Sequence, residues 1–204
     1  MTILEFVSII RDSLVGGAAI TTAVVAVSGL NNWRRELRGR IEFETARNLI
    51  KATYQVRDKL QASRSPYVLV NEFPTDYPGD YNATVEQKLQ AWSYIYNNRW
   101  APVREALKDF DIYALEAEAL WGSDIRVEAD NLRHCAVKLQ TAMQAFIDNK
   151  EQQGEDFRLD KEFAKEVNSD LYYIATNADN PLSNKIKNVV HAIEVVVRPH
   201  LRRM

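Results

Sequence analysis

The chain has 204 residues, of which 46% are apolar and 26% are charged, and its formal net charge is −2. This length fits one domain with an added segment, and the composition is that of an ordinary globular protein. The single cysteine, Cys135, excludes an intramolecular disulfide. Its place in a helical pattern favours a small buried side chain over a reactive thiol, which would need a partner base.

The charge is unevenly distributed along the chain. From Arg34 to Arg64 there are nine basic and four acidic residues, whereas from Ser65 to the end there are sixteen basic and twenty-two acidic residues. Basic charge therefore follows the apolar N-terminal segment, and the remainder of the chain is mildly acidic.

The N-terminal segment 1–33 favours a membrane span. Between Asp12 and Arg34 lie 21 residues without a charge, and a helix of about 20 residues crosses the hydrocarbon core of a bilayer. We therefore expect a single transmembrane helix from about Ser13 to Trp33. Burial of this helix in a soluble assembly stays an alternative, because small and polar residues dilute the segment: Gly16, Gly17, Thr21, Thr22, Ser28 and Gly29.

The residues after this segment predict its orientation. Trp33 suits the membrane interface, and the arginines that follow it would lie near lipid headgroups on the cytoplasmic side, namely Arg34, Arg35, Arg38 and Arg40. The expected location is the inner membrane, with the N-terminus outside and residues 34–204 in the cytoplasm. Interleaved glutamates such as Glu36 weaken any polyanion groove, so we expect no nucleic-acid partner.

Small residues also recur at a four-residue spacing in this segment. Ser13, Gly17 and Thr21 would share one helix face, and small side chains on one face let helices approach closely in lipid. This pattern favours association of the protein with further copies of itself, although a span without a partner would fit the same residues.

The first helix of the domain 34–204 is predicted to run from about Trp33 to Ala62. Its apolar stripe consists of Leu49, Thr53, Val56 and Leu60. The Ser65-Pro66 pair ends it, and an irregular, proline-rich loop follows at 66–82. Aromatic residues of this loop either pack on the domain or bind a partner: Tyr67, Phe73, Tyr77 and Tyr81.

The second long helix follows a predicted capping box at Thr84 and Gln87. Pro102 predicts a kink or an end near Arg99, and a shorter helix is expected over 111–121 with Gly122 as its end. The expected buried face carries large apolar residues at spacings of three and four: Val85, Leu89, Trp92, Tyr96, Trp100, Val103 and Leu107.

Three further helices are expected in the C-terminal half. One is capped by Ser123 and ends before a loop at 152–156, a second follows Asp160 and the last begins at Asn180-Pro181. The inward residues expected in the second are Phe163, Val167, Leu171 and Ile174. No hairpin or βα alternation occurs. The predicted fold class is therefore all-α, an N-terminal transmembrane helix followed by an up-and-down helical bundle.

Residue patterns typical of catalysis are missing from the sequence. The three histidines form no metal-binding frame, and no phosphate-binding glycine motif occurs, so we expect no enzyme, no cofactor, no metal and no small-molecule substrate. The first functional hypothesis is a membrane-anchored interaction or scaffold protein that binds a protein partner or self-assembles. An oligomeric membrane effector or pore is the second hypothesis, and an enzyme with a site near the 66–82 loop is the third.

Overall fold

The computed structural model describes residues 3–173 and 179–201, without the side chains of residues 3–15 and 18–20. The described chain is 85% helical and contains no strand, which confirms the all-α class and a bundle-like packing. The α-helices are α1 (Ile3–Ser63), α2 (Val85–Trp121), α3 (Ser123–Glu151), α4 (Glu155–Leu159), α5 (Lys161–Leu171) and α6 (Pro181–Val197). Two short 3-10 helices are η1 (Val70–Glu72) and η2 (Arg198–Leu201).

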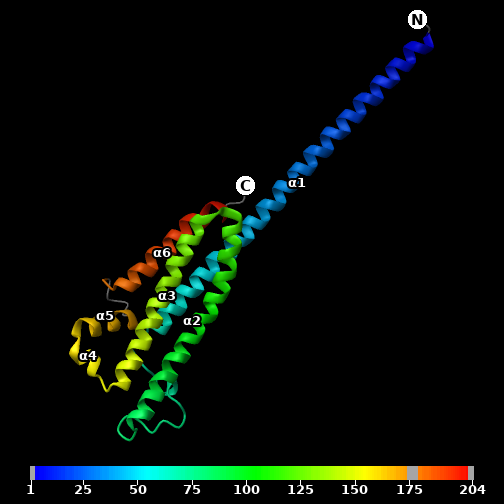
Figure 1. Cartoon of the computed structure of the whole chain (residues 1–204). Coiled ribbons are helices and arrows are strands. Elements are labelled where there is room, and N and C mark those ends of the chain that lie inside the picture. Colours follow the sequence, from blue (N-terminus) through cyan, green and yellow to red (C-terminus); the bar gives the residue numbers. More distant parts are fainter. Residues whose placement is uncertain (1–2, 174–178, 202–204) are drawn as a thin grey trace.

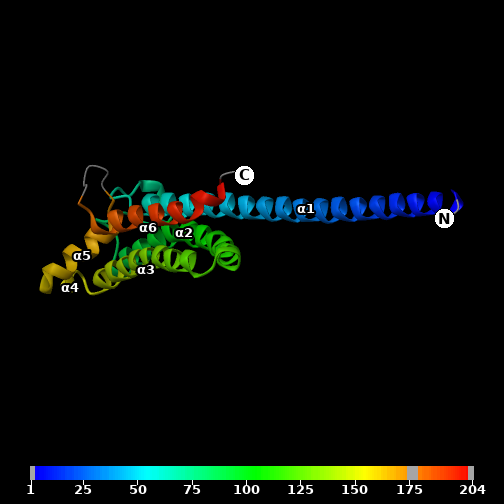
Figure 2. The same cartoon turned by 90° about the horizontal axis from the view of Figure 1, so that it is seen from above.

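The core of the fold is a ring of four helices (Figure 1). The C-terminal part of α1 packs against α2, α2 against α3, α3 against α6, and α6 against α1. The short helices α4 and α5 lie at the end of the bundle remote from the N-terminus. The N-terminal part of α1 extends beyond the bundle as a single helix in both views (Figures 1 and 2).

The predicted stripe of α1 is buried in the core. Leu49, Thr53, Val56 and Leu60 are all fully buried. The Thr53 hydroxyl donates a hydrogen bond to the Leu49 carbonyl oxygen at 2.8 Å, which satisfies this polar group inside the bundle. Because these side chains recur at three- and four-residue spacings, they lie on one face of the helix.

The buried face of α2 differs from the predicted one. Tyr96 and Val103 are buried as expected, but Val85 is exposed, and Trp92 and Trp100 are only partly buried. Half of the buried residues of α2 are alanines, in the set Ala91, Ile95, Tyr96, Val103, Ala106, Phe110, Ala114 and Ala117. Trp92 and Trp100 lie on the flank of this surface, where small alanines let the helices approach closely.

Pro102 does not end α2, so the expected helix end near Arg99 is wrong, whereas the alternative of a kink within the helix stays a prediction. The helix continues from Val85 to Trp121, so the expected separate helix at 111–121 is its last part. Proline cannot donate to the carbonyl group of Asn98, four residues earlier. Both residues are exposed, so water can satisfy that carbonyl. Gly122 ends α2 as predicted, with a φ of +89° that suits glycine.

Three predicted helix starts are confirmed by their side-chain caps. Thr84 Oγ1 accepts from the amide of Gln87 at 3.2 Å, and the Gln87 side chain accepts from the amide of Thr84 at 2.9 Å. Asp160 and Asn180 each accept from the amide three residues later at 2.9 Å. Part of the expected loop at 152–156 is helical, since α4 begins at Glu155. Phe163 is exposed rather than inward, and Ile174 lies outside the described residues.

Arg64 joins the end of α1 to α5 and α6. Its side chain is buried, and its guanidinium donates to the carbonyl oxygens of Asp170, Ser169 and Tyr172 at 2.7, 3.1 and 3.4 Å. It also donates to Asn180 Oδ1 and Ser183 Oγ, each at 2.9 Å. One side chain therefore satisfies acceptors at the C-terminus of α5 and the N-terminus of α6.

The prediction of a single-pass protein in the inner membrane is contradicted. Within the described residues, no helix has a stretch that is both long enough and apolar enough to cross a bilayer. The uncharged run in this part of the sequence extends from Ser13 to Trp33. Polar and small residues such as Ser28 and Gly29 interrupt this run, and Arg34 ends it.

Candidate interaction surface

The most unusual surface of the protein is the projecting part of α1. We call residues 21–41 the stem, because every side chain in this range is exposed. An isolated helix in water is marginally stable, and a helix in a protein normally gains stability by burying one face. The stem buries none against the described bundle, so its face is available for a contact outside the chain.

Apolar side chains form a stripe along the stem. Leu30, Trp33, Leu37 and Ile41 follow one another at spacings of three, four and four residues, and each is between 44% and 61% exposed. At 3.6 residues per turn they lie within an arc of about 80°. This spacing is typical of one face of a helix–helix contact, and clustered exposed apolar residues mark interaction sites.

The stripe is not an extension of the buried face of α1. The buried face is defined by Leu49, Val56 and Leu60. At 3.6 residues per turn, the angle about the helix axis between this face and the stripe is about a third of a turn. A partner on the stripe would therefore approach from a direction different from that of the bundle helices.

Arginines border the stripe on both sides. Within the stem, Arg34 and Arg40 are the charged residues nearest to it, about 60° to either side of its centre by helical geometry, and the exposed Glu44 lies in line with the stripe just beyond Ile41. Glu36 and Glu42 lie farther round the helix. They pair with arginines four residues away, since Arg38 Nε lies 2.9 Å from Glu42 Oε1 and Arg40 Nη2 lies 3.8 Å from Glu36 Oε1. The border of the stripe is therefore cationic.

Aromatic stacking fixes the base of the stem. The His200 ring stacks on Trp121 with centroids 4.1 Å apart and planes 11° apart. Its Nδ1 lies 3.5 Å from Glu42 Oε2, one residue beyond the stem. These contacts join η2, the end of α2 and α1 where α1 leaves the bundle. The stem thus extends from a fixed base.

The predicted membrane-interface residues all lie on the stem. Trp33 belongs to the apolar stripe, while Arg34, Arg35, Arg38 and Arg40 are exposed beside it or behind it. The structure thus brings these five residues onto one short length of exposed helix. Their predicted role at lipid headgroups depended on the span, which the structure contradicts.

The predicted helix-association residues lie at the other end of the projecting helix. The Thr21 hydroxyl donates to the carbonyl oxygen of Gly17 at 2.9 Å, and nothing lies within 4 Å of a methyl group built on Gly17. Ser13 is in α1, but its side chain lies outside the described part. No described residue packs on this face, so its role in association stays a prediction.

The aromatic residues of the 66–82 loop divide into two pairs. Phe73 and Tyr77 stack with centroids 4.9 Å apart, and Phe73 meets the edge of Trp92 at 6.1 Å. Tyr67 and Tyr81 are exposed instead. Of these four residues, Tyr67 and Tyr81 are therefore the most accessible to a partner of the loop, while Phe73 and Tyr77 are partly buried.

Arg99 fastens this loop to α2. Its guanidinium contacts Glu72 at 2.6 and 3.0 Å and donates to the carbonyl oxygens of Ser65 and Tyr67 at 2.7 Å each. The hydrogen bonds that Glu72 accepts from Arg99 lower the pKa of Glu72, and burial of its carboxylate only partly opposes this effect. Sequence reasoning missed this pair, because the two residues lie 27 positions apart and neither belongs to a motif.

The described residues contain no group of three or more histidine, cysteine or acidic residues that could hold a metal ion.

Comparison with known proteins identifies no relative of this chain. No protein-family model matches the chain, and neither the curated proteins nor the solved structures contain a match.

Proposed function

We propose that this chain is a helical interaction protein whose stem binds an amphipathic helix of a partner protein. The observation that carries the proposal is the apolar stripe of the stem, which projects beyond the bundle and remains exposed along its whole length. Burial of such a stripe would stabilise a complex through the hydrophobic effect, by about 25 cal/mol for each Å² of apolar surface removed from water.

Charge favours an acidic partner over a second stem. Arg34 and Arg40 border the stripe on opposite sides, so a partner helix with glutamates beside its own apolar face would place opposite charges together. Two identical stems packed in parallel would bring arginines near each other on both borders. Like charges at these positions disfavour that pairing.

The test uses the full chain and two designed helical peptides with the same leucine face. One peptide carries glutamates beside that face and the other carries lysines. We expect the acidic peptide to bind more tightly in fluorescence anisotropy titrations, and the preference to reverse in an Arg34→Glu/Arg40→Glu variant. A double variant Leu30→Ser/Leu37→Ser should lose binding of the acidic peptide.

Matched controls come from the same helix. Val24 and Val25 are exposed apolar residues of the projecting helix that lie outside the stripe, so Val24→Ser/Val25→Ser should leave binding unchanged. Equal binding of both peptides, or equal losses in both serine variants, would refute the proposal. Sedimentation equilibrium of the chain alone tests the alternative that a second copy of the chain binds to the stripe. Self-association that Leu30→Ser/Leu37→Ser abolishes would show that a second copy covers the stripe.

A further inference from the structure

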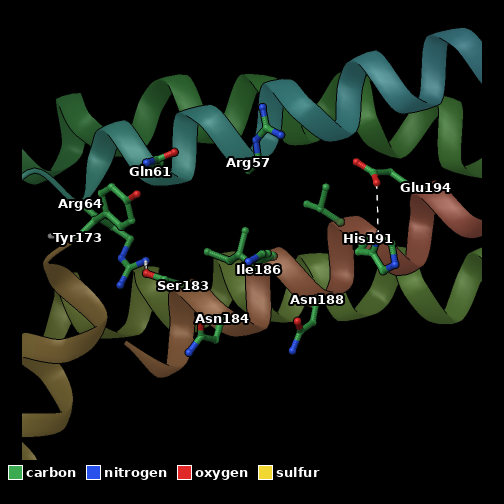
Figure 3. Close-up of a pocket in the computed structure, with 12 residues that line it drawn as sticks. Arg57, Gln61, Arg64, Tyr173, Ser183, Asn184, Ile186, Asn188, His191 and Glu194 are labelled. Atoms are coloured by element: carbon green, nitrogen blue, oxygen red, sulfur yellow. Dashed lines mark hydrogen bonds and ion pairs between the residues drawn. The ribbon is translucent and has the colours of Figure 1, made fainter. Parts of the chain in front are cut away.

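A groove separates α1 from α6 on the side of the bundle (Figure 3). Hydrogen bonds join the two helices at either end of it. Tyr54 donates to Glu194 Oε1 at 2.8 Å, and Arg64 Nη1 donates to Ser183 Oγ at 2.9 Å. The volume between these links is about 650 Å³. This volume falls in the range of roughly 300–1,000 Å³ that small-molecule sites occupy.

The floor of the groove is apolar. Ile186 and Val190, on successive turns of α6, both belong to the buried core and also line the groove. Figure 3 shows Ile186 in the space between the two helices. A ligand with an apolar body would therefore remove its own apolar surface from water by packing on these side chains, which are themselves only 6% and 4% exposed.

The rim of the groove is cationic. Arg57, which pairs with Asp58 at 2.8 Å, and Lys187 line it together with the buried Arg64, and the carboxylate of Glu194 faces them. That carboxylate already accepts a hydrogen bond from Tyr54, and its other oxygen lies 3.5 Å from His191 Nδ1. Positive charge thus exceeds negative charge around the groove, which favours an anion.

The partners of Arg64 support the same inference. All five acceptors of its guanidinium are neutral, three being main-chain carbonyl oxygens and two being the side chains of Asn180 and Ser183. Among the described residues, no carboxylate forms an ion pair with Arg64. Burial lowers the pKa of Arg64, and the nearby carboxylate of Asp170, which itself pairs with Lys138 at 3.3 Å, only partly opposes this effect. An anion in the groove would therefore stabilise the charged guanidinium further.

We propose that this groove binds a small organic anion with an apolar body, its carboxylate or phosphate lying among Arg57, Arg64 and Lys187 and its apolar part covering Ile186 and Val190. This site is separate from the stem and does not depend on the function proposed for it. The groove would recognise a small molecule that carries both a negatively charged group and an apolar part.

The test titrates the full chain with 8-anilinonaphthalene-1-sulfonate, an aromatic anion whose fluorescence rises in apolar surroundings. The double variant Arg57→Glu/Lys187→Glu should raise its dissociation constant at least about tenfold, because two rim cations become anions. Arg64 is left unchanged, since its contacts join three helices. The matched control is Lys59→Glu/Lys185→Glu, which makes the same change of net charge on the same two helices at residues that do not line the groove.

Competition separates the two parts of the ligand. At constant ionic strength, octanoate should displace the probe, whereas 1-octanol and inorganic phosphate should displace it at least about tenfold less well, because each supplies only half of the recognised chemistry. Equal losses in the groove and control variants would overturn the proposal, since general charge would then explain binding. Equal displacement by octanoate and octanol, or by octanoate and phosphate, would overturn it as well.

Discussion

Replacement of Arg64 tests whether one buried side chain holds the end of α1 to α5 and α6. In an Arg64→Ala variant the carbonyl oxygen of Asp170 loses its donor at 2.7 Å. Ser169 and Asn180 keep other partners, because Asn180 Nδ2 donates to the Ser169 carbonyl oxygen at 2.7 Å and the Ser183 amide donates to Asn180 Oδ1 at 2.9 Å.

The size of the effect follows from what is lost. A buried acceptor left without a donor costs about 1–3 kcal/mol, and the three methylene groups of the arginine stem contribute about 0.8 kcal/mol each when buried. We therefore expect Arg64→Ala to lower the free energy of unfolding by about 3–5 kcal/mol. Arg64→Met keeps most of the apolar stem, so its loss should be only about 1–3 kcal/mol.

Urea denaturation followed by circular dichroism measures these differences. The control is Lys59→Ala on the same helix, an exposed position where the change should stay within about 0.5 kcal/mol. An Arg64→Met variant as stable as the parent would refute the reasoning. In that case the free-energy cost of desolvating the buried guanidinium would equal the stabilisation from all of its hydrogen bonds.

Three further predictions concern α2 and its contacts. Glu72→Gln should destabilise the protein at neutral pH, and the difference should disappear as the pH falls from the ordinary pKa of Glu72 through its lowered pKa in the folded protein, because the carboxylate contributes this stability only while it is ionised; denaturation at several pH values measures this. Pro102→Ala should raise the melting temperature, because alanine restores an amide donor to the carbonyl group of Asn98, and a lower melting temperature would contradict this. Trp121→Phe should change the free energy of unfolding by less than about 1 kcal/mol, because the buried Nε1 has no partner among the described residues and its removal offsets lost packing; chemical denaturation checks it.

Local chemistry explains which parts of the fold the sequence could predict. The caps at Thr84, Asp160 and Asn180 involve residues three positions apart, so the chain itself carries the whole pattern. The stripe from Leu49 to Leu60 is likewise a periodic feature of one helix. Neither depends on where the rest of the chain lies.

Features that depend on distant contacts were missed. Arg64 counts in the sequence as one more cation of a basic stretch, but its acceptors lie more than 100 residues later. The buried face of α2 was assigned to large residues such as Trp92, whereas the buried set includes alanines such as Ala106 and leaves Trp92 partly exposed. The exposed stem was also missed, because the same uncharged run and arginines fit a membrane span. Nothing in their periodicity shows that no neighbour covers them.

The continuity of α1 makes the stem mechanically dependent on the bundle. One unbroken helix includes both Leu37 on the stem and Leu49 in the core, so bending between them requires breaking main-chain hydrogen bonds. A twist of the bundle end is therefore passed on to the stripe. Insertion of a single residue between Ile41 and Thr45 would rotate the stripe by about 100° and advance it by about 1.5 Å. The number of residues in this short connection thus sets the angular phase at which the protein presents its apolar face.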